Sequence, residues 1–197
     1  DYLFKSKVKG FALSLSGGLD SSSIAILIYE MVKRILERKG NEVFNKELCL
    51  NINFTDKIHL NVKKVIKKIL FTAYQETQNS SKETKESAKI LSDFIGSNHY
   101  EWSIDSEIRS ITDKISNETT KTYSWEEDDI TLQNVQARVR SPFIWFIANA
   151  NNLLLLSTSN RSESSVGYST MDGDSSGSIS PIAGVDKIFI KKLLIYL

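Results

Sequence analysis

The feature that most constrains the fold is a short polar loop between two apolar segments. Residues 16–22 are SGGLDSS, and the apolar run before them, VKGFALSL at residues 8–15, suits a buried strand. After the loop, apolar residues recur at helical spacing over residues 21–37, at Ile24, Leu27, Ile28, Met31 and Ile35. Because glycine lets a backbone turn tightly, the sequence predicts a strand, a glycine-rich turn and a helix in direct succession.

The loop also has the composition of an anion site. The first turn of a helix presents free N–H groups and a positive dipole end, and serine hydroxyls add further donors. Such a site suits a phosphate chain. Asp20 would repel phosphate unless a Mg²⁺ ion lies between them, because Mg²⁺ is held by one or two carboxylates together with phosphate oxygens. The alternative is that Asp20 only caps the helix.

The loop differs from the common nucleotide-binding motifs. It contains no lysine, so it is not G-x-x-x-x-G-K-[ST], and its glycines do not fit G-x-G-x-x-G. It resembles the S-G-G-x-D-S motif of the PP-loop ATP pyrophosphatases, and it has the required position after a strand and before a helix. The resemblance implies cleavage of ATP between the α- and β-phosphates and adenylation of a substrate.

Strands and helices alternate along most of the chain. Further strands are expected at 69–74, 99–105 and 153–157. Further helices are expected at 58–68 on the surface, from Ser81 to about Ile95, from Ser106, and over 131–150. In the last of these, Pro142 should cause a kink or mark a new first turn. Residues 47–54 are either a strand or irregular. The pattern predicts one α/β domain over residues 1–197, with a parallel sheet, helices on both faces, and a ligand at the carboxyl ends of the strands. The long loop at 169–181 is a candidate lid.

Composition narrows the function classes. Lysine and arginine number 25 against 24 aspartates and glutamates, a net charge of +1, which gives no support to nucleic-acid or membrane partners. Cys49 is the single cysteine, so the chain cannot form a disulfide framework or a cysteine-rich zinc site. Its apolar surroundings predict a small buried side chain. The single cysteine favours a reducing compartment. The sequence has no secretion signal and no apolar stretch that approaches the roughly 18 residues of a membrane span. Together these features predict a cytoplasmic location.

Several ordered segments resemble the NAD synthetase family. They are QNVQARVRSPFIWFIAN (133–149), LLLLSTSNRSESSVGYSTMDGDSSGSISPIAGVDK (153–187) and YQETQNSSKETKESAKILSDFIGSNHYEWSID (74–105). The resemblance extends over roughly residues 8–195, and its TMDGD and PIAGVDK segments are more similar to the glutamine-dependent branch than to the ammonia-only branch. It implies the adenine nucleotide alpha hydrolase-like (PP-loop) fold. It also implies that the chain is a synthetase fragment of a longer protein, without the glutaminase domain and the C-terminal end.

The resemblance also implies a set of site residues. ATP would be bound by Ser16, Gly17, Gly18, Leu19, Asp20, Ser21, Thr158 and Lys187; Mg²⁺ by Asp20 and Glu163; and deamido-NAD by Asn134, Arg140 and Glu163. Asn134 and Arg140 lie six residues apart, so on one straight helix their directions differ by about 240°. They cannot both point squarely into one pocket unless the helix is distorted near Pro142.

Simpler interpretations of two of these residues stay open. Arg140 could be a solvated helix charge. Glu163 could merely be a first-turn acid of a helix capped by Asn160 or Ser162, where acids are favoured.

The implied function is ATP-dependent amidation of deamido-NAD (nicotinic acid adenine dinucleotide) to NAD. The carboxylate would be activated as an acyl-adenylate with release of pyrophosphate, and ammonia, either free or derived from glutamine, would then displace AMP. No residue stands out as a catalytic acid or base. The resemblance further implies Mg²⁺ as the cofactor and a homodimer. Two alternatives stay open: another PP-loop amidotransferase, such as a GMP synthetase relative, and a non-catalytic ATP-binding module.

Overall fold

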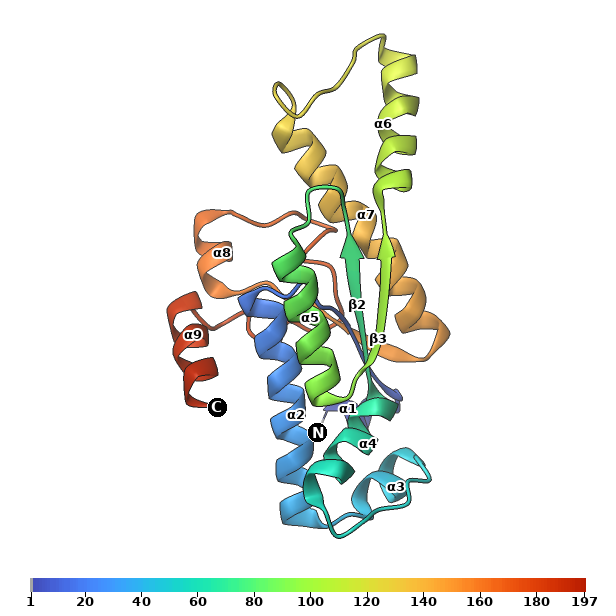
Figure 1. Ribbon diagram of the computed structural model, residues 1–197, viewed down its shortest axis with the longest axis vertical. Coiled ribbons are helices and arrows are strands. Elements are labelled where there is room, and N and C mark those ends of the chain that lie inside the picture. The colour runs from blue at the N-terminus through green and yellow to red at the C-terminus, as the bar shows by residue number, and fades with distance from the viewer. Residues whose placement is uncertain (1) are drawn as a thin grey trace.

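A four-stranded parallel sheet forms the centre of the computed structural model, which describes residues 2–197 (Figure 1). The strands are β1 (Gly10–Ser14), β2 (Leu70–Glu76), β3 (Asn98–Ser103) and β4 (Leu153–Leu156), in the order β3-β2-β1-β4. Phe11 of β1 lies beside Leu70 of β2 on one side and Leu154 of β4 on the other. All four expected strands are therefore confirmed, and their carboxyl ends lie along one edge of the sheet.

Nine helices occur within residues 2–197. They are α1 (Tyr2–Ser6), α2 (Leu19–Lys39), α3 (Val43–Leu48), α4 (Ile58–Ile69), α5 (Lys82–Ile95), α6 (Asp105–Thr119), α7 (Asp129–Ala150), α8 (Arg161–Val166) and α9 (Lys187–Tyr196). In the part of the chain that the structure describes, none of them has the length and apolar character needed to cross a membrane.

The helices cover both faces of the sheet. Figure 1 shows α2 and α5 in front of the strands and α7 behind them. Because side chains alternate along a strand, Phe11 and Leu13 of β1 face a large core that includes residues of α2, α4, α5 and α9. Ala12 faces the opposite way, into a smaller core with Leu155 of β4 and Ile144 of α7. The expected α/β arrangement is confirmed.

The ends of two helices follow from local chemistry. Helix α5 begins after Ser81, whose Oγ accepts a hydrogen bond from the Thr84 N–H at 3.2 Å, and it ends at Gly96 with a φ of 81°. Helix α2 ends at Gly40, as its sequence predicts. Helix α7 continues through Pro142 as one helix, so this proline does not start a new one.

The segment between α2 and β2 differs from expectation. Helix α3 ends at Cys49, which has a left-handed φ of 53° and is exposed, so the prediction of a buried Cys49 is wrong. The neighbouring Phe44 and Ile52 are buried and supply the apolar contacts instead. Helix α4 is more than a surface helix, because Val62 and Val65 on one of its faces are completely buried.

Candidate functional site

The loop between β1 and α2 is held in shape by its own hydroxyl groups. Ser21 Oγ accepts a hydrogen bond from the Ser16 N–H at 3.2 Å, donates to the Gly18 carbonyl at 3.3 Å, and lies 3.1 Å from Ser16 Oγ. The Gly18 N–H donates to Ser16 Oγ at 3.3 Å. These bonds form within the protein itself, so the curvature of the loop is built before any ligand binds.

Two glycines allow the loop to take this path. Gly17 has a φ of 75°, and a Cβ placed on it would lie 2.1 Å from the Thr84 carbonyl oxygen of α5. Gly18 is the N-cap of α2, and no side chain caps the first turn of that helix. The loop therefore lies directly against α5, and the first-turn amides of α2 stay available to an anion.

Asp20 lies in the first turn of α2, and the N-cap of that helix is Gly18. The alternative that Asp20 only caps the helix is therefore wrong. Its Oδ1 accepts a hydrogen bond from Asn160 Nδ2 at 3.1 Å, and its Oδ2 lies 3.1 Å from Lys187 Nζ. Its side chain is 16% exposed. Both carboxylate oxygens are therefore bound to groups that come from the C-terminal part of the chain.

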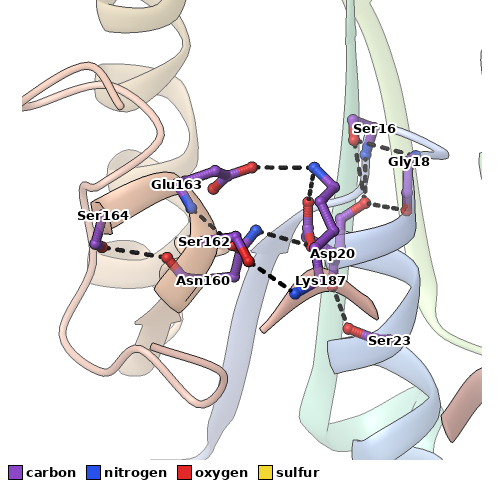
Figure 2. Close-up of polar contacts among 10 residues, drawn as sticks. Ser16, Gly18, Asp20, Ser23, Asn160, Ser162, Glu163, Ser164 and Lys187 are labelled. Carbon is purple, nitrogen blue, oxygen red and sulfur yellow. Dashed lines mark hydrogen bonds and ion pairs between the residues drawn. The ribbon is translucent and has the colours of Figure 1, made fainter. Parts of the chain in front are cut away.

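Lys187 connects Asp20 to Glu163, as Figure 2 shows. Its Nζ also lies 3.2 Å from Glu163 Oε1. Partial burial lowers the pKa of Lys187, but hydrogen bonds to the two carboxylates, together with their charges, outweigh burial and raise that pKa above its ordinary value. Residues from α2, α8 and α9 thus meet at one point near the carboxyl ends of β1 and β4.

This arrangement fits a magnesium site shared with a phosphate ligand. The Asp20 and Glu163 carboxylates converge on one cation, the Lys187 ammonium. No group of three or more histidine, cysteine, aspartate or glutamate side chains within residues 2–197 is arranged to hold a metal. A Mg²⁺ ion bound here would therefore take its remaining ligands from phosphate and water, as Mg²⁺ commonly does.

Asn160 is a site residue whose contact with Asp20 the sequence analysis missed. It is fully buried, and its Oδ1 accepts a hydrogen bond from the Glu163 N–H at 3.0 Å, which makes it the N-cap of α8. Its Nδ2 donates to Asp20, so one side chain holds both the Asp20 carboxylate and the backbone of Glu163. The position before a helix is the only signal in the sequence, and it indicates a cap but not the link to residue 20.

The start of α9 is attached to the start of α8. The Lys187 N–H donates a hydrogen bond to Ser162 Oγ at 3.1 Å, and Asp186, the N-cap of α9, forms an ion pair with Arg161 at 3.0 Å. These contacts hold the backbone of Lys187 beside Glu163, while the lysine side chain is 49% exposed. The lysine is thereby fixed at its backbone, independently of the two carboxylates that its ammonium contacts.

A cavity of about 330 Å³ lies at the same edge of the sheet. Its lining includes Ser16 of the loop, Thr158 after β4 and Arg140 of α7. Burial lowers the pKa of Arg140, and within residues 2–197 no carboxylate offsets that effect. An unpaired guanidinium beside hydroxyl groups suits an anionic ligand.

Asn134 is not among the residues that line this cavity. Its Oδ1 accepts a hydrogen bond from Thr170 Oγ1 at 2.9 Å, so it holds the 169–181 loop. The structure brings Arg140 to the cavity and Asn134 to the loop, in agreement with the different directions that their spacing predicts.

The 169–181 loop forms one wall of the cavity. Ser141 Oγ of α7 donates to the Asp172 carbonyl at 2.6 Å, and Trp145 Nε1 donates to Ser176 Oγ at 2.7 Å. Together with the contact of Asn134, these bonds attach the loop to α7 at several points along the helix, and its function as a lid stays a prediction.

Comparisons with known proteins agree with this fold. The chain is 32% identical over 215 residues to the glutamine-dependent NAD(+) synthetase of Saccharomyces cerevisiae and 34% identical over 203 residues to that of Homo sapiens. The crystal structure of a glutamine-dependent NAD(+) synthetase from Cytophaga hutchinsonii has a TM-score of 0.94 and 47% identity, covering 100% of this chain and 35% of that one. The NH3-dependent NAD synthetase of Campylobacter jejuni has a TM-score of 0.67 and 25% identity, covering 98% and 66%.

The alignments with the yeast and human proteins cover 100% and 95% of this chain but only 30% and 29% of those proteins. The chain therefore spans about 30% of the length of the curated relatives it matches. A family model described as NAD synthase matches residues 1–197. Because that match covers the whole chain and the structural neighbours share its PP-loop type of fold, the protein belongs to the NAD synthase family.

Proposed function

We propose that the protein containing this chain uses ATP to amidate deamido-NAD to NAD. A carboxylate is a poor electrophile, so the reaction needs an activated acyl group. Attack of the carboxylate oxygen on the α-phosphorus of ATP forms the acyl-adenylate and releases pyrophosphate. Ammonia, supplied free or by glutamine, then attacks the acyl carbon and releases AMP.

The observation that supports this proposal best is the convergence of Asp20 and Glu163 on one cation, beside the loop and the cavity. Adenylation requires charge stabilisation of a departing pyrophosphate, and a Mg²⁺ ion bound by the two carboxylates would supply it. Asn160 keeps Asp20 in place for that purpose. The first-turn amides of α2 would bind phosphate oxygens of ATP.

The other residues would position the reactants. We propose that Arg140, which faces the cavity without an ion-pair partner within residues 2–197, binds an anionic group of the nucleotide or of the dinucleotide substrate. Thr158 lies in the same lining and would contact the adenylate. Asn134 would act through the 169–181 loop, which it holds by Thr170.

The 169–181 loop would also limit the access of water to the site. An acyl-adenylate hydrolyses if water reaches it before ammonia does, so the site must close around it. Gly173, Asp174 and Ser176 of the loop already line the cavity. We propose that the loop closes further on substrate, with α7 as its fixed support.

We also propose an oligomeric state and a cellular location for the protein. Large apolar side chains are exposed on two helices, including Phe146 of α7 and Ile188 and Ile195 of α9. Such surfaces are typical of subunit interfaces, and we propose that the protein forms a homodimer. The single cysteine supports a reducing compartment, and we propose a cytoplasmic location.

The test uses the full-length protein with ATP, Mg²⁺ and either ammonium or glutamine. We expect pyrophosphate release that depends on deamido-NAD and is accompanied by NAD formation, and no release with XMP. Release that depends on XMP would identify a GMP synthetase relative, and nucleotide binding without release would identify a non-catalytic module. Either result would overturn the proposal.

A pair of variants tests the role of Asp20. We expect Asp20→Ala to abolish Mg²⁺-dependent turnover while the circular dichroism spectrum stays unchanged. The matched control is Asp56→Ala, since Asp56 is an exposed aspartate before α4. Turnover that survives in Asp20→Ala would show that the carboxylate has no part in catalysis.

A further inference from the structure

The Lys187 ammonium lies between the two carboxylates that would hold Mg²⁺. Its Nζ is 3.1 Å from Asp20 Oδ2 and 3.2 Å from Glu163 Oε1, and these are the oxygens on which the proposed metal site depends (Figure 2). We infer that Lys187 is an internal stand-in for the metal: it neutralises the carboxylates while no nucleotide is bound, and it leaves them when Mg²⁺ enters together with ATP. This inference rests on the proposed function.

The ammonium and the metal cannot share this position. Mg²⁺ binds oxygen at about 2.0–2.1 Å, so an ion bound between Asp20 Oδ2 and Glu163 Oε1 would overlap the space that Nζ occupies. A second cation beside a lysine that has not moved would also be repelled by it. Free Mg²⁺ must therefore displace Lys187 before it can bind.

The contacts around the cluster determine which group moves. The side chains of Asp20 and Glu163 are only 16% and 18% exposed, and Asn160 holds Asp20 from the other side. The lysine side chain is 49% exposed and has a flexible four-carbon stem. Asp20 is thus held without the lysine, both carboxylates are largely shielded from solvent, and the exposed ammonium is the group that can swing out.

The backbone contacts of Lys187 keep it close after it moves. Its N–H is bound to Ser162 Oγ, and the ion pair of Asp186 with Arg161 holds the start of α9 against α8. Phosphate oxygens of ATP bound at the loop would offer the released ammonium a new anionic partner. ATP would therefore make displacement favourable by giving the lysine a new partner, and metal and nucleotide would bind with positive coupling.

A simpler explanation is that Lys187 only fastens α9 to α2. A purely structural ion pair and a stand-in cation predict different results when the positive charge is removed. If Lys187 only links α9 to α2, its replacement leaves two unshielded carboxylates but also lets α9 move away. In that case there is no reason for metal binding to become tighter. Loss of a stand-in opens the cation position while the carboxylates stay in place.

The test measures Mn²⁺ binding by electron paramagnetic resonance in the full-length protein without any nucleotide. We expect Lys187→Met to bind Mn²⁺ about tenfold more tightly than the wild type, the effect of removing one like charge a few ångströms away in a partly solvated site. Lys191→Met, an exposed lysine on the same helix, should bind as the wild type does. Adding Asp20→Asn to Lys187→Met should remove the gain, which would place the ion at this site.

A second arm measures the coupling. In the wild type, a non-hydrolysable ATP analogue should strengthen Mn²⁺ binding, and in Lys187→Met that strengthening should be smaller. Lys187→Gln, which keeps a hydrogen-bonding side chain, should behave like the methionine variant and provides a second test if the latter is unstable.

Unchanged or weaker Mn²⁺ binding in both Lys187 variants, with an unchanged circular dichroism spectrum, would overturn the inference. Neither arm contains deamido-NAD or measures turnover. Failure of this inference can therefore be distinguished from failure of the proposed function. A protein that gains Mn²⁺ affinity as expected but releases no pyrophosphate with deamido-NAD would support the stand-in and refute the function.

Discussion

Replacing Asn160 by alanine would remove two contacts made by one buried side chain. The first is the hydrogen bond from the Glu163 N–H to Oδ1, which caps α8. The second is the hydrogen bond from Nδ2 to the Asp20 carboxylate. Serine separates them, because its hydroxyl caps a helix about as well as asparagine does but is too short to reach Asp20.

The magnitudes follow from these two bonds. Loss of an N-cap costs about 1 kcal/mol, and a hydrogen bond to a charged group contributes about 1.5–3 kcal/mol. Asp20 is 16% exposed and retains Lys187, so we take the lower value of about 1.5 kcal/mol for the second bond. Asn160→Ala should then destabilise the cluster by about 2.5 kcal/mol and Asn160→Ser by about 1.5 kcal/mol.

Hydrogen exchange measured by mass spectrometry in the full-length protein can resolve the difference. In α8 the alanine variant should exchange about fivefold faster than the serine variant, because 1 kcal/mol corresponds to a factor of about five in a local equilibrium. Binding of Mg·ATP, measured by calorimetry, should weaken similarly in both variants, since both lose the support of Asp20.

Two outcomes would refute this reasoning. Equal exchange of α8 in the alanine and serine variants would show that Asn160 does not cap this helix in solution. Undiminished Mg·ATP binding in both variants would show that the contact with Asp20 has no part in holding the nucleotide.

Three further predictions concern other positions. Gly17→Ala should destabilise the protein by more than about 1 kcal/mol, because φ is 75° and the new Cβ would meet backbone; in thermal melts Gly18→Ala, with a φ of −80°, should change far less. Arg140→Met should weaken ATP or deamido-NAD binding by about tenfold in calorimetry, whereas Arg38→Met, at the exposed far end of α2, should not. Burial lowers the pKa of His99, so the folded state binds its proton less readily than the unfolded chain. Stability should fall as pH drops below about 6.5, by up to about 1.4 kcal/mol per pH unit, and urea melts of His99→Gln should show a smaller decline.

The sequence allows the sheet and the first loop to be predicted because both depend on local pattern. Continuous apolar runs such as 153–157 indicate strands buried on both faces, and the glycines at 17 and 18 indicate the turn. The cap at Ser81 follows from the side chain itself. Each of these signals is contained within a few neighbouring residues.

The meeting of Lys187 with Asp20 is a different kind of feature. It depends on how α9 and α8 pack beside α2, and no local pattern specifies packing between segments more than a hundred residues apart. A lysine near phosphate was implied by family resemblance, but its contact with both carboxylates was not. The hydrogen bond from Asn160 to Asp20 escaped prediction for the same reason.

Cys49 shows how a local pattern can mislead. The run ELCLNI suggests a buried segment, but the chain takes a left-handed turn at this residue and points it to solvent. The apolar residues on either side are accommodated by the end of α3 and the following loop. Composition alone cannot distinguish a buried run from one that a turn interrupts.

The strand order β3-β2-β1-β4 has a consequence for how such enzymes can diversify. The chain passes from β1 to one side of the sheet to build β2 and β3, and it returns to the other side to build β4, so a crevice opens at β1. One rim of the crevice is the loop at 16–22, and the other comes from α7 and the 169–181 loop. Mutations on the second rim can alter which ligand the crevice accepts without disturbing the first, so a lineage can change one ligand and inherit the loop at 16–22 intact.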